Sequence, residues 1–338
     1  ALPAAAPTAG GDVPAAAALG ATPGVIVSRA AALAESPRVK IESDRLAGSI
    51  ALKGGRFDDL TLTTYRETIE ADSPPIKLLS PSNGPNGYFA EFGWVGDKPG
   101  AAPGADALWL ASSQALTAGK TVTLRWKGET GLVFERKIGL DDGYMFTIED
   151  TVRNDGGAPA TLRPYGLVSR VGLPKVSKLF VLFEGPLGVL GGTKKEVEYK
   201  DLMEDGSKGV VEQATEGGWI GMTDVYWLTA VIPDPKQTVK ARFLHHAVNG
   251  QDRFQTDYAA ELGVVLAPGA TTNFTHRFFG GAKEVKLLDR YEAELGVEQF
   301  DLAIDFGWFY FLTKPFFYAL DWLYGILGNF GLAIMGLT

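Results

Sequence analysis

Hydrophobic and polar residues alternate with a period of two along most of the chain, between about residues 39 and 279. In the clearest run, Val122, Leu124 and Trp126 alternate with polar neighbours, as the two faces of a half-buried strand require. Runs of the same kind cover residues 48–52, 60–65, 132–138, 144–153, 162–167, 219–222, 227–232, 239–244 and 273–279. The pattern therefore predicts a chain that is mainly β.

Turn signals separate several of these runs. Asp142-Gly143 and Asn249-Gly250 are pairs that tolerate positive φ and favour tight hairpins, and Asp155-Gly156-Gly157 is a further turn signal. Frequent turns, almost no helical period and no repeat of fixed length favour large antiparallel sheets packed face to face. We expect one long β-sandwich rather than a propeller or a solenoid.

The period changes near the C-terminus. In residues 284–295, Leu288, Tyr291 and Leu295 fall on one face of a helix, with charged residues opposite. The composition then shifts, because residues 300–338 contain only four charged side chains and twelve aromatic ones. We therefore expect a helix at the end of the sandwich, followed by an aromatic tail.

The aromatic tail has the pattern of a helix on a bilayer surface. Pro315 suits the first turn of a new helix, because the N–H that proline lacks would be unpaired there. On that helix Phe316, Leu320, Leu323 and Leu327 share one face at spacings of three and four. Trp and Tyr rings prefer the headgroup layer of a membrane. The side chains expected at this interface are Trp308, Phe316, Phe317, Leu320, Trp322 and Leu323. The alternative is a helix buried in the core.

Gly328 and Asn329 are expected to break the amphipathic helix. The following run, residues 330–337, is wholly apolar. It is far shorter than the roughly 20 residues that span a bilayer. We interpret it as the first turns of a transmembrane helix.

Composition narrows the class of protein. The net charge of −8 argues against a nucleic-acid partner, because phosphate binding needs clustered Lys and Arg, and it leaves any membrane attachment mostly apolar. The absence of cysteine excludes disulfides, thiolate metal sites and a Cys nucleophile. The Ala, Pro and Gly bias of the first residues indicates a flexible tether. We expect a tether over residues 1–30, a β domain over 31–297, and the amphipathic helix with the start of a transmembrane helix over 298–338.

No constellation of catalytic, cofactor-binding or metal-binding residues stands out. Gly119-Lys120-Thr121 ends like a phosphate loop, but the first glycine of that motif is missing. His245 and His246 are adjacent on a predicted strand and point to opposite faces, so they cannot share a metal ion. Either histidine with His276 and a carboxylate would suit acid–base chemistry, although ordinary core or surface histidines are favoured. The sequence predicts a protein that is not an enzyme.

Several blocks of sequence closely resemble one family, the bacterial YidC membrane-protein insertases. The most specific block is in the tail and includes Asp305, Gly307, Pro315, Gly328 and Asn329. The block over residues 217–227 includes Trp219, Tyr226 and Trp227. Further similar blocks cover residues 52–62, 65–68, 78–81, 88–94 and 279–284. The resemblance extends over residues 36–338, with the blocks in family order.

The resemblance implies a large periplasmic domain with a β-supersandwich like that of galactose mutarotases. It also implies a place on the periplasmic side of the inner membrane of a Gram-negative bacterium. The expected partners are the lipid bilayer, nascent membrane proteins and Sec translocon subunits, with a chaperone-like role in protein transport and membrane insertion and no cofactor. The tail blocks would join the domain to the second transmembrane helix.

Two other functions remain open from the sequence. A carbohydrate-binding or mutarotase-like protein would use aromatic platforms, for which Trp94, Trp109 and Trp219 are candidates. A purely structural protein of the lipid surface would have its whole function in the tail.

Overall fold

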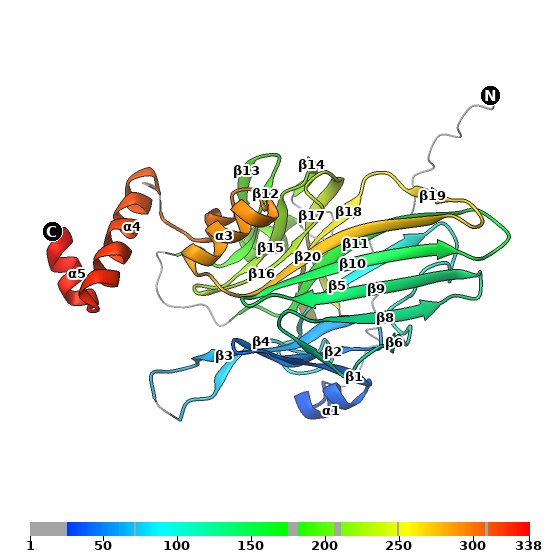
Figure 1. Cartoon of the computed structure of the whole chain (residues 1–338), viewed down its shortest axis with the longest axis horizontal. Coiled ribbons are helices and arrows are strands. Elements are labelled where there is room, and N and C mark those ends of the chain that lie inside the picture. Colours follow the sequence, from blue (N-terminus) through cyan, green and yellow to red (C-terminus); the bar gives the residue numbers. More distant parts are fainter. Residues whose placement is uncertain (1–25, 71, 175–181, 206–210, 249, 308–309) are drawn as a thin grey trace.

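The computed structural model describes residues 26–70, 72–174, 182–205, 211–248, 250–307 and 310–338. Within these ranges two large β-sheets pack face to face, and two helices stand out from one end of the sandwich (Figure 1). The expected mainly β class, with antiparallel sheets followed by C-terminal helices, is confirmed.

The first sheet has eleven strands in the described part of the chain. Their order is β14-β17-β18-β11-β5-β3-β2-β1-β7, with β19 paired to β11 and β4 paired to β3. All pairs in this sheet are antiparallel except β1 with β7. The bounds are β1 Arg38–Glu42, β2 Leu46–Ala51, β3 Arg56–Arg66, β4 Pro75–Leu79, β5 Tyr88–Gly96, β7 Ala115–Thr117, β11 Ala160–Val171, β14 Val211–Glu216, β17 Thr238–Val248, β18 Gln251–Ala260 and β19 Val264–Leu266.

The second sheet has nine strands in the described ranges, all antiparallel. Their order is β13-β12-β15-β16-β20-β10-β9-β8-β6. The bounds are β6 Leu110–Ala111, β8 Thr121–Lys127, β9 Leu132–Leu140, β10 Met145–Asn154, β12 Gly185–Leu190, β13 Thr193–Glu196, β15 Trp219–Thr223, β16 Trp227–Ile232 and β20 Thr271–Ala282. Strand β20 lies near the middle of this sheet, between β10 and β16.

The expected turns lie at strand connections. Asp142-Gly143 joins the antiparallel pair β9 and β10. The second expected hairpin joins β17 and β18, where Val248 pairs with Gln251 and Gly250 has a φ of +75°, although Asn249 lies outside the described residues. The Asp155-Gly156-Gly157 turn carries the chain from β10 in one sheet to β11 in the other.

The core lies between the two sheets and is rich in aromatic rings. Phe57 of β3 meets Phe146 of β10 edge to face, with 5.2 Å between ring centroids, and Phe278 of β20 lies 5.3 Å from Phe57. All three side chains are buried. Burying a phenylalanine contributes about 2–3 kcal/mol, so this cluster is one of the places where the sheets are held together.

A buried polar cluster also bridges the sheets, and we call it the core network: Trp94, Arg136, Asp150, Tyr258 and His276. Arg136 donates to both carboxylate oxygens of Asp150, at 2.7 and 2.8 Å. Trp94 of the first sheet donates to Asp150 at 2.8 Å, and the Tyr258 hydroxyl is hydrogen-bonded to His276 Nδ1. Burial alone would raise the pKa of Asp150, but the Arg136 guanidinium outweighs it and lowers that pKa. Burial lowers the pKa of His276 to about 3.

The N-terminal end of the described chain packs on the sandwich, which differs from the expected tether over residues 1–30. Ser28 caps the short helix α1 (Arg29–Ala34). Arg29 donates to the Leu79 carbonyl and pairs with Asp59. Residues 26–30 therefore belong to the folded domain, and residues 1–25 lie outside the described residues.

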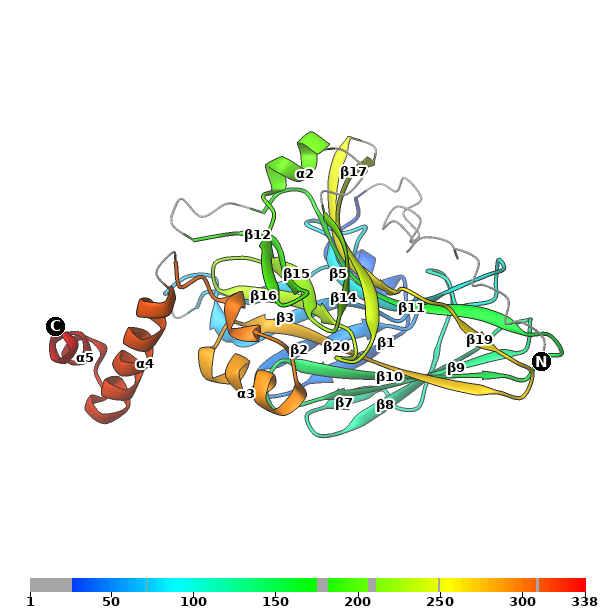
Figure 2. The same cartoon turned by 90° about the horizontal axis from the view of Figure 1, so that it is seen from above.

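Helix α3 (Val285–Leu295) packs on the end of the second sheet, where the sequence predicted a helix over residues 284–295 (Figure 2). Its buried side chains include Leu288 and Tyr291. Gly143 makes this contact possible, because a Cβ there would lie 2.3 Å from the Tyr291 hydroxyl. Gly296, with a φ of +68°, ends the helix in the left-handed conformation that glycine favours.

The folded domain extends past the expected boundary at residue 297. A 3₁₀ turn, η2 (Phe300–Ala303), follows α3, and Phe300 is fully buried against Phe279, with 5.3 Å between ring centroids. The sequence suggested a tail from residue 298 because charge falls there. Low charge fits a buried segment equally well, and here Phe300, Asp301 and Ala303 are buried.

Two helices follow, α4 (Tyr310–Leu327) and α5 (Phe330–Leu337). They stand away from one end of the sandwich (Figures 1 and 2). Pro315 lies inside α4, so the expectation that it begins a helix was wrong. The helix starts about one turn earlier and tolerates the one hydrogen bond that the proline removes.

Candidate functional site

The side chains of four family blocks meet where the sandwich joins α4. A groove of about 590 Å³ opens there. We call it the joint groove, and six of the residues that line it are Tyr65, Tyr226, Trp227, Lys283, Asp305 and Phe317. Tyr65 lies in β3 and Trp227 begins β16, with Tyr226 in the turn before it. Lys283 directly follows β20, Asp305 lies in the segment before α4, and Phe317 lies in α4.

The aromatic wall of the joint groove comes from the β15–β16 turn. Tyr226 is 63% exposed, while Trp227 is half-buried and meets Tyr65 edge to face at 5.0 Å between ring centroids. The Lys283 backbone N–H donates to the Tyr226 carbonyl at 3.0 Å, which fixes this turn against the end of β20. The sequence therefore places one exposed and one packed ring side by side.

Glu284 lines the groove and accepts hydrogen bonds from three side chains. Arg45 Nη1 donates to both of its oxygens, at 2.8 and 2.9 Å, and the hydroxyls of Tyr65 and Tyr144 each donate at 3.1 Å. Hydrogen bonding to Glu284 raises the pKa of Arg45, and burial together with the Glu284 charge raises the pKa of Tyr65. Glu284 is also the residue before α3, so it ties the N-terminus of that helix to the first sheet.

Lys283 has a different environment from its neighbour. Its Nζ donates to the Thr223 hydroxyl at 2.9 Å. Among the residues that the structure describes, no carboxylate oxygen lies within 4.0 Å of this ammonium group. Burial lowers the pKa of Lys283 to about 8. Within the described part of the chain, the contact of this cation is therefore a neutral hydroxyl.

Asp305 and Gly307 shape the link from η2 to α4. Asp305 Oδ1 accepts from the Gly307 N–H at 2.8 Å, and Oδ2 accepts from the Phe183 N–H at 3.2 Å. Gly307 has a φ of +75°, which a residue with a Cβ rarely adopts. These two family-motif residues thus set the direction in which the chain leaves the sandwich.

The remaining family-motif residues are structural in the same region. Trp219 is buried, and its Nε1 donates to the Glu298 carbonyl at 3.1 Å, which holds η2 on the sheet. Gly328, with a φ of +62°, ends α4. Asn329 caps α5 by accepting from the Leu332 N–H at 3.2 Å. The family-motif residues of the tail therefore shape turns and cap helices rather than forming a catalytic site.

Three polar contacts, which we call the joint contacts, fasten α4 to the domain. Lys314 pairs with Asp301 at 2.6 Å, and Lys286 of α3 pairs with Asp321 at 2.7 Å. The Tyr318 hydroxyl donates to Asp289. All three contacts lie on the side of α4 that faces α3 and η2.

The predicted interface residues divide into two groups. Phe316, Phe317 and Trp322 are 49%, 40% and 65% exposed. Leu320 and Leu323 are half-buried, and Leu323 faces α5, where a Cβ on Gly336 would lie 3.8 Å from it. Trp308 lies outside the described residues. Part of the expected lipid-facing stripe is therefore used to pack α5 on α4.

Helix α5 adds to the apolar surface of the tail. Phe330 packs on Tyr324 with 4.7 Å between ring centroids. Exposed apolar side chains continue along both helices, and they are Leu312, Phe316, Phe317, Trp322, Tyr324, Ile326, Leu327, Phe330, Leu332, Ile334 and Met335. A search of the described residues finds no helix with the length and hydropathy to cross a bilayer.

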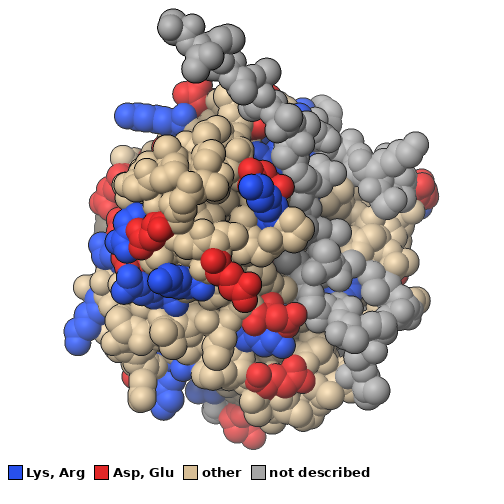
Figure 3. Space-filling view, turned by 90° about the vertical axis from the view of Figure 1, so that its right-hand side faces the viewer, with Lys and Arg blue, Asp and Glu red and all other residues tan. Residues whose placement is uncertain are grey.

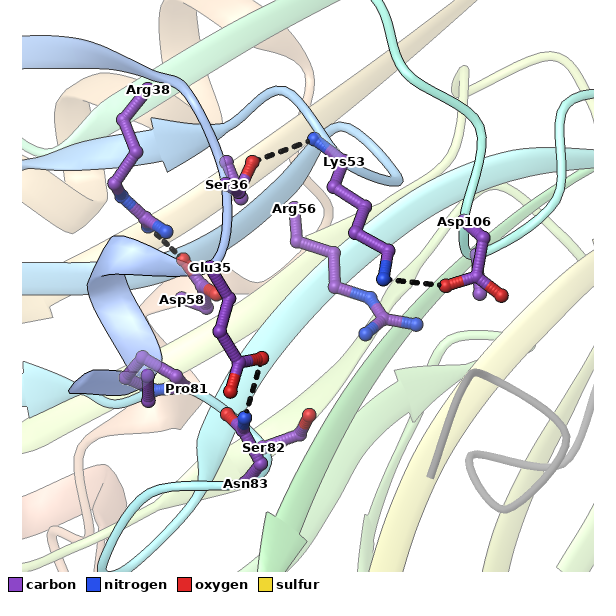
Figure 4. Close-up of a pocket in the computed structure, with 13 residues that line it drawn as sticks. Glu35, Ser36, Arg38, Lys53, Arg56, Asp58, Pro81, Ser82, Asn83 and Asp106 are labelled. Atoms are coloured by element: carbon purple, nitrogen blue, oxygen red, sulfur yellow. Dashed lines mark hydrogen bonds and ion pairs between the residues drawn. The ribbon is translucent and has the colours of Figure 1, made fainter. Parts of the chain in front are cut away.

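A second, polar pocket of about 90 Å³ lies beside α1 (Figure 4). Its charges contact each other, with Lys53 paired to Asp106 at 2.8 Å and Arg38 paired to Asp58. A space of this volume holds a few water molecules at most. On the face of the sandwich remote from α4, basic and acidic side chains are interspersed (Figure 3).

The histidines and the candidate sugar platforms have other roles here. His276 belongs to the core network, and His245 pairs with Asp252 at 2.9 Å. Trp94, Trp109 and Trp219 are all buried, so none presents an open ring to a sugar. No cluster of three or more metal-ligating side chains occurs within the described ranges.

Sequence reasoning missed Arg45 altogether, and it named Tyr65, Lys283 and Glu284 only as members of family blocks. The signal available was that two such blocks, residues 65–68 and 279–284, occur in one chain. Nothing in the spacing showed that they meet, because Arg45 and Glu284 are 239 residues apart.

Comparison with known proteins gives a consistent result. A family model described as the YidC periplasmic domain matches residues 38–319. A protein named membrane protein insertase YidC from Methylobacterium nodulans is 45% identical over 94% of this chain and 54% of its own length. Proteins with that name from Methylobacterium radiotolerans and Granulibacter bethesdensis are 46% and 45% identical over 100% and 90% of this chain. The chain spans about half the length of the curated relatives it matches.

Similar solved structures are more distant. A putative aldose 1-epimerase from Escherichia coli K12 has 9% identity and a TM-score of 0.45, covering 72% of this chain and 98% of its own. A galactose mutarotase related enzyme from Lactobacillus acidophilus has 10% identity and a TM-score of 0.43, covering 72% of this chain and 97% of its own. With TM-scores below 0.5, neither likeness adds to the description of the fold.

Proposed function

The chain belongs to the family of YidC periplasmic domains, and from this membership we propose that it is the non-catalytic periplasmic part of a membrane-protein insertase. Its place is at the inner membrane, where the whole protein assists the insertion and folding of nascent membrane proteins, alone or with the Sec translocon. The family match over residues 38–319 and the names of the relatives support this role.

Insertion requires no bond chemistry. Its main cost is the transfer of polar groups through hydrocarbon, which is several kcal/mol for each unsatisfied group. A periplasmic domain contributes by holding the membrane part in position and by contacting partners. The polar side chains described for the sandwich form ion pairs and hydrogen bonds within the domain. The ion pair of Arg136 with Asp150 is the most buried of them.

The observation that carries the membrane role is the exposed apolar surface of α4 and α5. Trp322, Ile326 and Met335 are 65%, 62% and 74% exposed. Soluble proteins rarely expose contiguous apolar surface of this kind unless it binds something. We place the tail in the headgroup and upper acyl layer of the bilayer, with Phe316, Phe317, Leu320, Trp322 and Leu323 near the interface, together with Trp308.

The joint contacts set the orientation of the sandwich relative to the membrane. They fix α4 against α3 and η2, so the sandwich is held beside the membrane rather than on a loose tether. The exposed side of α4 then faces the lipid while the domain stays in the periplasm.

Vesicle flotation tests the attachment. The 338-residue chain is mixed with phosphatidylcholine vesicles and centrifuged through a density gradient. The double variant Phe316→Glu/Trp322→Glu is expected to lose roughly 90% of the floated protein or more, because two charges in the apolar layer cost about 2–4 kcal/mol or more.

The matched control places the same charges at the other end of the sandwich. Leu262 and Val265 are 64% and 67% exposed, so Leu262→Glu/Val265→Glu is expected to float like the unmodified chain. Equal flotation of the tail variant and this control would remove the basis for the membrane-surface role.

Replacement in cells tests the insertase role. The gene that encodes this chain is expected to sustain growth of a Gram-negative host depleted of its own insertase. Vesicle binding without rescue would instead favour a structural protein of the lipid surface.

A further inference from the structure

The joint groove has cations and aromatic side chains that the connection between sandwich and tail does not require. It lies between the end of the sandwich and α4, and one of its walls, Phe317, belongs to the apolar tail. Its volume of about 590 Å³ is in the range of small-molecule sites. The groove therefore runs into the same apolar surface that we place on the lipid.

The charges of the groove favour an anion. Lys283 donates to the Thr223 hydroxyl and, among the described residues, has no carboxylate oxygen within 4.0 Å. Arg66 also lines the groove, and its Nη1 donates to the neutral Ser73 carbonyl at 2.6 Å. Glu284 is occupied by Arg45, and Asp305 by two backbone N–H groups. A half-buried ammonium with only a neutral acceptor is costly, and an anion in contact would offset that cost.

The aromatic residues favour an apolar chain attached to that anion. Tyr226 is 63% exposed at the rim, and Phe317 of α4 is 40% exposed on the tail side. Trp227 also lines the groove, with its ring 6.0 Å from that of Tyr226 between centroids. A free inorganic ion would use the cations and leave these rings in water.

We propose that the joint groove binds the phosphate-bearing end of one anionic phospholipid. Lys283 and Arg66 contact the phosphate, and an acyl chain runs past Tyr226 and Phe317 toward α4. This inference rests on the proposed membrane attachment, because it takes its ligand from the bilayer beside the tail. It adds a specific lipid contact to an attachment that is otherwise apolar.

The protonation of Lys283 gives the site a pH dependence. Burial lowers its pKa to about 8, the charges of Asp224, Asp305 and Glu184 oppose that effect, and Lys194 reinforces it. Lipid binding is therefore strong below about pH 8 and weakens as the pH rises through this value. Arginine keeps its charge over this range, so Lys283 accounts for the loss.

Calorimetric titration with a lipid that needs no bilayer tests the proposal. The 338-residue chain is titrated with dihexanoyl phosphatidylglycerol below its micelle concentration, with dihexanoyl phosphatidylcholine, and with glycerol phosphate. Phosphatidylglycerol is expected to bind tightest. Lys283→Met is expected to weaken this binding roughly tenfold and to abolish its pH dependence near pH 8.

Two further variants keep the result interpretable. Lys137→Met is the control, because Lys137 is exposed on β9, pairs with Glu149 and does not line the groove. Its affinity is expected to stay within twofold. Tyr226→Ala, at an exposed position that cannot unfold the domain, is expected to weaken binding of the lipid but not of glycerol phosphate.

The outcomes separate this inference from the proposed function. Unchanged phosphatidylglycerol affinity in Lys283→Met, or equal affinity for glycerol phosphate and the lipid, would overturn the lipid site even if the chain floats with vesicles. Failure to float with phosphatidylcholine vesicles, together with tight and Lys283-dependent lipid titration, would overturn the tail attachment and leave the groove site standing.

Discussion

The core network and the joint contacts use the same kinds of side chain in opposite surroundings. In the core network Arg136 and Asp150 are 0% and 3% exposed and connect strands of both sheets. In the joint contacts Lys286 is 78% and Asp321 32% exposed, and Lys314 is 30% exposed. Burial makes the first set essential to folding, while solvent makes the second set weak and reversible.

The contrast shows how the molecule combines a rigid body with an adjustable attachment. Breaking a core pair leaves a charge in a medium that cannot solvate it, so the sheets and the pair are lost together. Breaking the Lys286–Asp321 contact leaves both partners in contact with water, so α4 is loosened while the sandwich remains folded. Four measurements test this contrast, from the largest expected effect to the smallest.

The largest effect is expected from Asp150→Asn. This change leaves the buried Arg136 guanidinium without a counter-charge and is expected to lower the free energy of unfolding by about 3–5 kcal/mol. Urea denaturation measures it. The double variant Arg136→Met/Asp150→Leu removes both charges and is expected to recover at least half of the loss. A loss below about 1 kcal/mol in Asp150→Asn would show that the core network is not essential.

The second effect is the response of the core network to acid. His276 has a pKa of about 3 in the folded protein, against an ordinary value of about 6.5 in the unfolded chain. Between these values the unfolded state binds a proton that the folded state does not. Stability therefore falls as the pH falls, by up to about 1.4 kcal/mol per pH unit from this group.

Denaturation at pH 6.5, 5.5 and 4.5 measures that slope. His276→Gln keeps an acceptor for Tyr258 but cannot take up a proton, so its stability is expected to change less over this range. The same slope in both proteins would mean that another group controls the acid response.

The third effect concerns Glu284, whose carboxylate accepts hydrogen bonds from Arg45, Tyr65 and Tyr144. Both partners of its pair with Arg45 are about one third exposed, so solvent screening reduces its contribution. Glu284→Gln is expected to cost about 1 kcal/mol in thermal or urea unfolding. Glu149→Gln breaks the exposed pair with Lys137 and is the matched control, with an expected change within about 0.5 kcal/mol. Equal losses in the two variants would remove the special role of Glu284.

The smallest effect on the sandwich is expected when the two joint contacts between α4 and α3 are removed. Tyr318→Phe/Asp321→Asn keeps the pair of Lys314 with the buried Asp301 and is expected to leave the free energy of unfolding of the sandwich within about 0.5 kcal/mol of its original value. Amide hydrogen exchange in residues 310–327 is expected to become faster, because α4 is no longer fastened to α3. A loss of sandwich stability similar to that of Asp150→Asn would contradict the contrast between the two regions.

The sequence predicted strands best where one face is buried and the other is wet. Strand β16 was predicted at its observed bounds, 227–232. Strand β5 was recognised as a family block but not as a strand, because its residues from Tyr88 to Trp94 are all buried and do not alternate. The same holds for β12, which is buried along its whole length. Alternation disappears when both faces are covered, and a period-two search then finds nothing.

The candidate site could be predicted only in part. The resemblance pointed to Tyr226, Trp227 and Asp305, which meet in the joint groove. Periodicity predicted a lipid-facing stripe on α4 but could not show that Leu323 packs against α5. The sequence contains no pattern that points to Arg45, because its partner Glu284 is distant along the chain and meets it only in the folded protein.

The position of β20 in the second sheet has a consequence for how the domain folds during synthesis. Its residues, Thr271–Ala282, pair with β10 and β16, so until they emerge both of those strands remain open edges. Strand β10 therefore stays unpaired on one side until a segment more than a hundred residues later in the chain is synthesised. Pairings of such long sequence separation fold in milliseconds to seconds. We expect nascent chains stopped before residue 271 to be digested by protease, and chains that extend past residue 303 to resist it.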